Sequence, residues 1–342
     1  MDNTLAAKDI STINDSIIME NLVAKDIHTL DDRLVDDKIT VKSYTTDKVE
    51  ETDTSFGVWY PEDQTNCPLI LFAHGYGGSS QSHAPLAAEL AAKGYVVVIP
   101  DREGDDAHGF WGIFTFMMFA TPLNTVTVDG TTLKLALEYV KKASQSENSP
   151  LSGGKVDTTR IISGGFSMGG VEAIHFAASQ QEDEAPDVRA LLLVSPSIMR
   201  FGTISWRISH TGLIETSKNL TCPTLLVTSD NDMAAVGAFS YHESVFQKST
   251  LVNVKTSSLD VDCPNTRKSS WNQFLTAPGK YMGLNDHFAL ACEETAPTGQ
   301  IIGPFLRNIL ANDEAGDLGL EGSEWLAPNV MNYNPVFQLV FG

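Results

Sequence analysis

The sequence predicts an α/β fold in which a mostly parallel, doubly wound sheet is flanked by helices. Short apolar runs of strand length alternate along the chain with segments of helix length. The central runs at 67–75 and 95–101 are nearly continuous in apolar residues, as in strands buried on both faces. No internal repeat or low-complexity linker divides the chain, so we expect one main domain at 37–312. An accessory segment at 1–36 and a C-terminal tail at 313–342 would flank it.

The predicted elements follow in the alternating order that this fold requires. The first two strands alternate apolar and polar residues, as paired strands do, and Gly94 is expected to close the first helix. The expected strands are 38–44, 55–60, 67–75, 95–101, 160–167, 188–197, 222–230 and 249–258. The expected helices are 84–94, 131–144, 168–180, 235–248 and 299–312.

An apolar insertion at about 102–125 interrupts this alternation. Its centre, 110–123, is rich in Phe and Met, but it is shorter than the roughly 20 residues that a membrane span needs. We therefore expect no transmembrane segment. Two interpretations stay open for the insertion: a buried helix, or an apolar cap that forms one wall of a substrate pocket.

The composition limits the classes of partner. The 342 residues are 42% hydrophobic and 19% charged, which is typical of a globular domain. The net charge of −20 repels nucleic acid and anionic membranes, so we expect neither as a partner. We also expect a monomer. The first residues have neither the basic nor the apolar region of a secretory signal. This predicts a cytoplasmic protein as the sequence stands, or a secreted one if a signal has been removed.

The four cysteines do not suggest a metal site. They stand at positions 67, 222, 263 and 292, and none forms a CxxC pair, so no structural zinc is expected. An even number permits disulfides without requiring them in a chain of this size. A bond between Cys263 and Cys292 stays open.

Ser167 is the candidate nucleophile. It stands in a Gly165-x-Ser167-x-Gly169 pattern, between the expected strand 160–167 and the expected helix 168–180. A serine on a sharp turn between a buried strand and a helix has the context of a nucleophile elbow. The alternative is a small structural serine in a glycine-rich turn, and the flanking strand and helix favour the nucleophile.

A serine nucleophile needs a base and an acid that orients the base, and in this arrangement they follow as serine, acid, histidine. Asp230 and Asp232, at the end of a later strand, are both candidates for the acid. His287, in a loop near the C-terminus, is the candidate base. His175 and His242 fall within expected helices, where a packing or surface role is favoured. The chemistry of such a triad requires no metal and no organic cofactor.

Two backbone amides are expected to stabilise the oxyanion. One is the N–H of Met168, which follows the nucleophile, and the other is the N–H of Tyr76 in the glycine-rich loop after the strand 67–75. His74 in that loop is interpreted as structural. The loop lacks the lysine and the spacing of a phosphate-binding motif.

Three stretches, HGYGGSS, GKVDTTRIISGGFSMGG and SDNDMAAV, resemble the dienelactone-hydrolase-like branch of the α/β-hydrolases, and within it the cutinase-like polyester hydrolases. The resemblance extends from about residue 66 to residue 310. It implies an α/β-hydrolase fold and a serine carboxylic ester hydrolase that acts on small or polymeric, neutral esters. It also implies that Asp232 rather than Asp230 is the triad acid. The substrate-binding residues that it implies are Tyr76, Phe166, Met168 and Ile198.

The chain departs from that family's pattern beside the nucleophile. Phe166 replaces the usual Trp or His, and no tryptophan stands near Ser197 and Ile198, although Phe201 and Trp206 follow. A chlorophyllase-like or lipase-like esterase for large apolar esters is therefore an alternative. A peptidase of the prolyl-oligopeptidase type is disfavoured because too few residues precede the core for a propeller domain. A hydrolase fold retained as a catalytically silent binding protein is the alternative from another class.

Overall fold

The computed structural model describes the chain between residues 39 and 310, with gaps. The described residues are 39–49, 54–75, 78–101, 128–182, 188–198, 210–229, 249–254 and 298–310, together with Asp232, Ala238, Tyr241, His242 and Leu290. The predicted accessory segment, insertion and C-terminal tail lie outside these residues, as do Cys263 and Cys292. Predictions about those parts therefore stay predictions.

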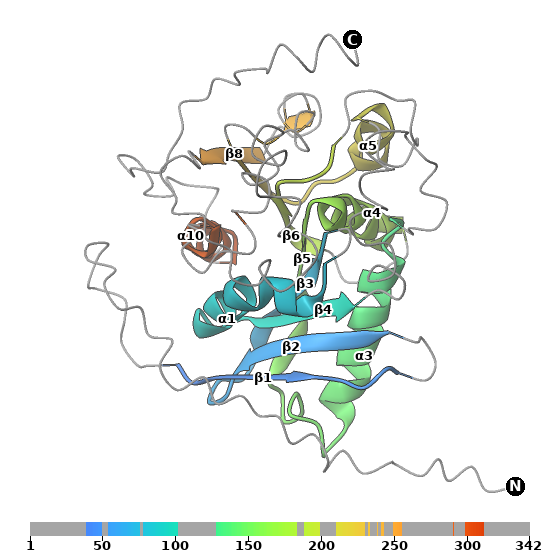
Figure 1. The fold of residues 1–342 in the computed structure, drawn as a ribbon. Helices are drawn as coiled ribbons and strands as arrows, with labels where there is room; N and C mark the ends of the chain where they lie inside the picture. Colours follow the sequence, from blue (N-terminus) through green and yellow to red (C-terminus); the bar gives the residue numbers. More distant parts are fainter. Residues whose placement is uncertain are drawn as a thin grey trace, which may run out of the picture.

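The described strands form one sheet with the order β1-β2-β4-β3-β5-β6-β7-β8 (Figure 1). The strands are β1 (Val41–Thr45), β2 (Ser55–Pro61), β3 (Cys67–Ala73), β4 (Val96–Asp101), β5 (Val156–Phe166), β6 (Val188–Val194), β7 (Thr224–Ser229) and β8 (Ser249–Val254). β2 is antiparallel to both of its neighbours, and every pair from β4 to β8 is parallel. The predicted mostly parallel sheet is confirmed, and its parallel strands all end at the same edge.

Helices cover both faces of the sheet (Figure 1). They are α1 (Ala84–Ala92), α3 (Thr131–Gln145), α4 (Met168–Glu182), α5 (His210–Ser217) and α10 (Thr298–Leu310), with a 3-10 turn, η2, at Ser80–His83. Leu69 and Leu71 of β3 pack into the cluster that includes α3, α4 and α5. Ile70 and Phe72 pack into the cluster that includes α1 and α10. Because successive strand residues point to opposite faces, a strand between two helical layers must be apolar throughout.

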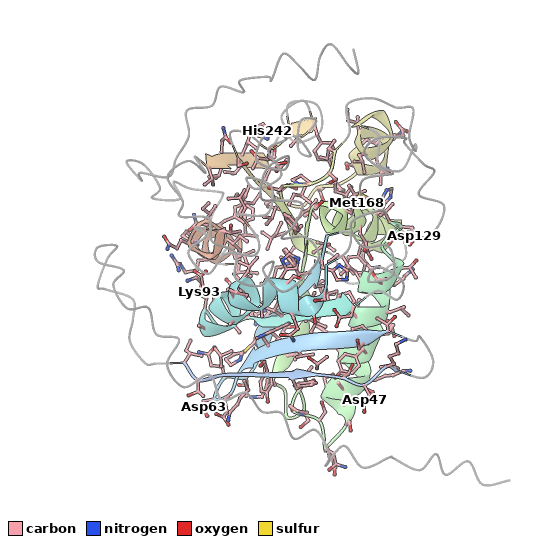
Figure 2. All side chains as sticks on the ribbon, in the orientation of Figure 1. Asp47, Asp63, Lys93, Asp129, Met168 and His242 are labelled. Atoms are coloured by element: carbon pink, nitrogen blue, oxygen red, sulfur yellow. The ribbon has the colours of Figure 1, made fainter. Side chains whose placement is uncertain are left out.

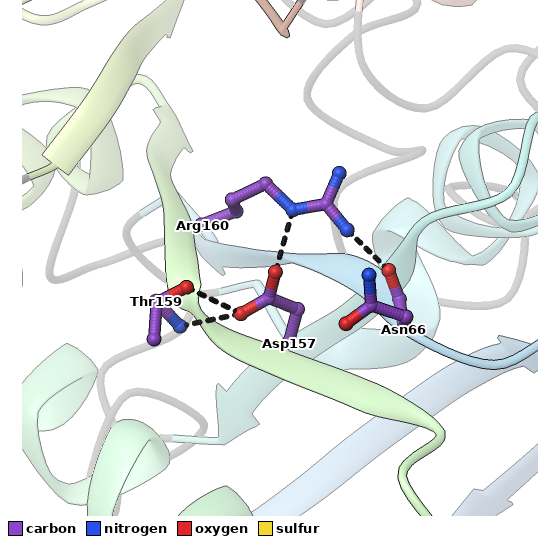
Figure 3. A network of polar contacts seen from close by, with 4 residues as sticks. All are labelled: Asn66, Asp157, Thr159 and Arg160. Atoms are coloured by element: carbon purple, nitrogen blue, oxygen red, sulfur yellow. Dashed lines mark hydrogen bonds and ion pairs between the residues drawn. The ribbon is translucent and has the colours of Figure 1, made fainter.

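A polar network supports the start of β5 (Figure 3). The Asp157 carboxylate accepts hydrogen bonds from the Thr159 backbone N–H (2.9 Å) and hydroxyl (2.6 Å), and it forms an ion pair with the Arg160 Nε at 2.6 Å. Arg160 also donates to the backbone carbonyl of Asn66, just before β3. The network lies where the register between β3 and β5 shifts, since Pro68 pairs with Asp157 and the next residue pairs with Ile161. The GKVDTTR stretch therefore has a structural role here.

The structure also differs from the sequence prediction in detail. β5 begins four residues before the predicted strand, because residues 157–159 are polar and do not extend the apolar run on which the prediction rests. α5 was not predicted, since it is short and its apolar residues show little helical periodicity. Gly94 follows α1 with φ +93°, as expected for a residue that ends a helix. Most of the predicted helix 235–248 lies outside the described residues.

Candidate active site

Ser167 occupies the turn between the central strand β5 and α4. Its φ of +55° lies in the left-handed region, which residues with a β-carbon seldom adopt. Such a conformation costs on the order of 1–3 kcal/mol and persists only where the surrounding structure imposes it. The backbone N–H of Ser167 donates to the Val194 carbonyl at 3.0 Å, which fixes the turn to the end of β6.

The glycines on either side of Ser167 allow the turn to pack closely. A β-carbon built on Gly165 would lie 2.2 Å from the carbonyl of Gly169, and one on Gly169 would lie 2.0 Å from the carbonyl oxygen of Ala73. Real β-carbons do not approach other atoms so closely. The Gly-x-Ser-x-Gly pattern is thus a steric requirement of strand, turn and helix meeting at this point.

The side chain of Ser167 is buried, with 8% of its surface exposed, and its hydroxyl contacts a second serine. The distance between Ser167 Oγ and Ser197 Oγ is 3.0 Å, and the Ser197 N–H donates to the Ser167 carbonyl at 3.0 Å. The sequence interpretation treated Ser197 only as a position without tryptophan. Its place at the end of the predicted strand 188–197, which should end at the same sheet edge as Ser167, was the available signal.

One of the two expected oxyanion donors, Met168, lies within the described residues. Met168 is the first residue of α4, so its N–H is at the positive end of the helix dipole (labelled in Figure 2). The loop after β3 approaches the turn closely, since a β-carbon built on Gly75 would lie 3.1 Å from the Ser167 β-carbon. Tyr76, the next residue, lies outside the described part of the chain. The buried His74 ring nitrogen Nδ1 lies 2.7 Å from the Gly75 carbonyl, which agrees with a structural role.

Asp232 lies beyond the end of β7, which is separated from β5 by one strand. It is 4% exposed, and its N–H donates to the Ser229 carbonyl at 3.4 Å. Asp232 therefore follows a strand that ends at the same sheet edge as β5. Asp230 and His287 lie outside the described residues. The assembly of Ser167, Asp232 and His287 into one triad stays a prediction.

Phe166 and Ile198, two of the residues expected to bind substrate, are buried inside the protein. Phe166 is 2% exposed, and its ring centroid lies 5.4 Å from that of His83. Ile198 is fully buried and belongs to the cluster on the α4 side of the sheet. In the chain, Phe166 precedes Ser167 and Ile198 follows Ser197. Their contact with a substrate stays a prediction.

Neither a metal site nor a membrane span is found among the described residues. Within them, no group of three His, Cys, Asp or Glu side chains is arranged to hold a metal ion. In the same part of the chain, no helix has the length and apolar character to cross a membrane. Cys67 and Cys222 are both buried, and burial raises the pKa of the Cys67 thiol.

A family model described as serine aminopeptidase, S33 (Hydrolase_4), matches residues 64–245. The chain belongs to this α/β-hydrolase family. The matched part of this α/β-hydrolase includes β3, the turn at Ser167, and Asp232. The mostly parallel sheet with helices on both faces is the fold expected of the family.

Curated relatives of this α/β-hydrolase include several cutinases. Cutinase est1 of Thermobifida alba is 25% identical over 193 residues, which are 56% of this chain and 51% of that protein. Cutinase 1 of Thermobifida cellulosilytica is 22% identical over 206 residues, 60% of this chain and 62% of that protein. Cutinase of Thermobifida fusca (strain YX) is also 22% identical, over 60% of this chain and 54% of that protein. The chain thus spans between 51% and 62% of the length of these relatives.

Proposed function

We propose that this protein is a serine carboxylic ester hydrolase. The observation that carries the proposal is the position of Ser167 at φ +55° between β5 and α4. A serine held in that conformation at the end of a central parallel strand presents its hydroxyl beside a helix N-terminus. The similarity to several cutinases supports ester hydrolysis.

The proposed mechanism is acyl transfer in two steps. His287 accepts the Ser167 proton as Oγ attacks the ester carbonyl, and Asp232 orients the imidazole and stabilises its charged form. The Tyr76 and Met168 amides donate hydrogen bonds to the oxyanion, each worth roughly 3 kcal/mol by analogy with serine proteases. His287 then protonates the leaving alkoxide. Water, deprotonated by the same histidine, attacks the acyl-enzyme, and Ser167 recovers its proton as the acid leaves.

The proposed substrates are neutral, apolar esters, either small or polymeric. A net charge of −20 disfavours anionic substrates, whereas apolar esters are unaffected by it. A larger lipase-like or chlorophyllase-like substrate would require an apolar pocket wall, for which the segment 110–123 is the candidate.

Peptide bond hydrolysis is the second candidate. The description of the matching family model, serine aminopeptidase, favours it. The same nucleophile, base and oxyanion donors serve amide and ester cleavage, so the distinction lies in substrate binding. A comparison of p-nitrophenyl esters with aminoacyl p-nitroanilides at equal concentration separates the two. Faster cleavage of the anilides would replace the esterase proposal.

The test of the esterase proposal is a chain-length series of p-nitrophenyl esters. Ser167→Ala is expected to lower kcat by at least about 10³-fold, because the covalent step is lost. Ser179→Ala is the matched control, since it removes a hydroxyl that bonds the Phe176 carbonyl within α4. Equal turnover by wild type and Ser167→Ala would show that Ser167 is not the nucleophile. If neither protein turns over any ester or anilide, a binding protein becomes the better interpretation.

A further inference from the structure

The turn that follows β6 is held against the nucleophile turn from several sides. The Ser195 N–H donates to the Val227 carbonyl of β7 at 2.7 Å, and the Ile198 N–H donates to the Pro196 carbonyl at 2.7 Å. Pro196 packs on the first turn of α4, since a β-carbon built on Gly170 would lie 3.0 Å from the Pro196 β-carbon. Ser195 has φ +43°, so the turn is also conformationally restricted. It is a well-supported platform beside Ser167.

Ser197 is the residue of this platform that contacts Ser167, and it does so twice. Its backbone N–H donates to the Ser167 carbonyl, and its hydroxyl oxygen lies 3.0 Å from the Ser167 hydroxyl oxygen. The backbone bond fixes the spacing between the two residues, so the contact between their hydroxyls follows from a defined geometry. Both side chains are buried, with 8% of Ser167 and 4% of Ser197 exposed. A hydrogen bond shielded from water in this way is stronger than one at the surface.

We propose that Ser197 is a catalytic residue whose hydroxyl donates a hydrogen bond to the Ser167 Oγ and stabilises the charge that develops there. The inference rests on the proposed function, because it requires Ser167 to be the nucleophile. With the two hydroxyl oxygens 3.0 Å apart, either hydroxyl can donate the hydrogen bond to the other. Ser167 must give its own proton to the base, which leaves its oxygen as an acceptor. Ser197 is then the donor.

The proposed hydrogen bond acts in both chemical steps. As the base removes the Ser167 proton, Oγ gains partial negative charge, and a hydrogen bond to a charged acceptor is about twice as strong as a neutral one. During deacylation the same oxygen is the leaving group and gains charge again. Ser197 keeps its own proton throughout and forms no covalent bond. Its hydroxyl therefore favours the transition states over the resting enzyme, which raises kcat rather than lowering KM.

The test compares Ser197→Ala, Ser197→Thr and Ser195→Ala with the wild type. Ser195→Ala is the matched control, because the Ser195 hydroxyl is buried two residues away and has no hydrogen-bond partner among the described residues. With p-nitrophenyl acetate, Ser197→Ala is expected to lower kcat about tenfold with little change in KM. Ser197→Thr keeps the hydroxyl and is expected to recover most of the rate, and Ser195→Ala to behave as wild type.

A second measurement is the rate at which an alkyl fluorophosphonate labels the protein, which reports attack by the serine oxygen. The expected result is labelling at Ser167 that is slowed by Ser197→Ala and restored by Ser197→Thr. If Ser197→Ala is labelled as fast as the wild type or faster, Ser197 is not the donor. The same conclusion follows if a folded Ser197→Thr protein is labelled as slowly as Ser197→Ala. Should Ser197→Ala not fold, Ser197→Cys repeats the test, because a thiol is a weak donor and the same loss is expected.

The labelling experiment also separates the two proposals. If the wild type is not labelled at Ser167, the proposed nucleophile is wrong and the inference about Ser197 is overturned with it. If Ser167 is labelled at the same rate in the wild type and in Ser197→Ala, only the inference about Ser197 is overturned.

Discussion

Thr132, near the start of α3, donates a hydrogen bond to the carboxyl group of Glu172 in α4, and both side chains are buried. Glu172 is fully buried and stands five residues after Ser167, in the helix that begins at the nucleophile turn. The bond joins two of the helices that cover one face of the sheet. Such a bond contributes to stability mainly because losing it leaves a buried acceptor with one fewer hydrogen-bond donor in a place that water does not reach.

Thr132→Val is expected to lower the free energy of unfolding by about 1–3 kcal/mol, because it removes the donor and keeps the shape. Urea denaturation followed by circular dichroism measures the change. Thr131→Val, at the adjacent exposed position, is the matched control and is expected to have little effect. Equal stability of the two variants would show that Glu172 does not depend on this hydrogen bond.

The Asp157 network predicts a dependence of stability on pH. Burial would raise the pKa of the Asp157 carboxyl, but hydrogen bonds from Thr159 and Arg160 and the charge of Arg160 outweigh it, so the pKa is lower than the ordinary 3.8. A group with a lowered pKa in the folded state stabilises the protein above its unfolded pKa and loses that effect as the pH falls through the folded value. The stability difference between wild type and Asp157→Asn is therefore expected to be full at neutral pH and to shrink below about pH 4.

Urea denaturation at a series of pH values between neutral and acid measures this difference. Asp63→Asn, which removes an exposed carboxylate in the turn after β2, is the charge-matched control (Figure 2). A stability difference for Asp157→Asn that is constant across the pH range would contradict the assignment of the network.

Gly169→Ala is expected to remove most of the proposed esterase activity, because the new β-carbon would lie 2.0 Å from the Ala73 carbonyl oxygen. The turn and β3 would have to separate, and this would move Ser167 relative to the loop at Gly75. Ester turnover and the melting temperature measure the two effects. Gly170→Ala is the comparison variant. Its new β-carbon would lie 3.0 Å from its nearest neighbour, the Pro196 β-carbon, so a smaller loss of activity and stability is expected. A Gly169→Ala protein with wild-type activity would rule out the steric explanation of the motif.

The choice between the two acid candidates is tested by mutation. Asp232→Asn is expected to lower kcat by about 10⁴-fold, because an amide cannot hold the histidine in the required tautomer or stabilise its charge. Asp230→Asn changes the same charge two residues away and is expected to have a small effect. The opposite ranking in steady-state ester hydrolysis would assign the role to Asp230.

Much of the fold could be predicted because its signals are local. The continuous apolar run of β3 predicted a strand between two layers, and the pattern around Ser167 predicted a strand, a turn and a helix. The bounds of strands in polar stretches could not be predicted as well as those in apolar runs. The start of β5 was placed at Arg160 because Asp157 and Thr159 do not belong to an apolar run. The hydrogen bond from Arg160 to the Asn66 carbonyl, which ties the start of β5 to β3, exists only once the two strands are neighbours.

Sequence alone determined the alternation of strands and helices, and it singled out Ser167 with candidate partners in the expected order. Apolar periodicity and glycine spacing are properties of neighbouring residues, so they can be read along one stretch of chain. The tertiary structure decided which distant groups meet. Ser197 contacts Ser167 because β6 lies beside β5, and Glu172 contacts Thr132 because α3 packs on α4. Strand order and helix packing arise from the burial of the whole chain, and no local pattern contains them.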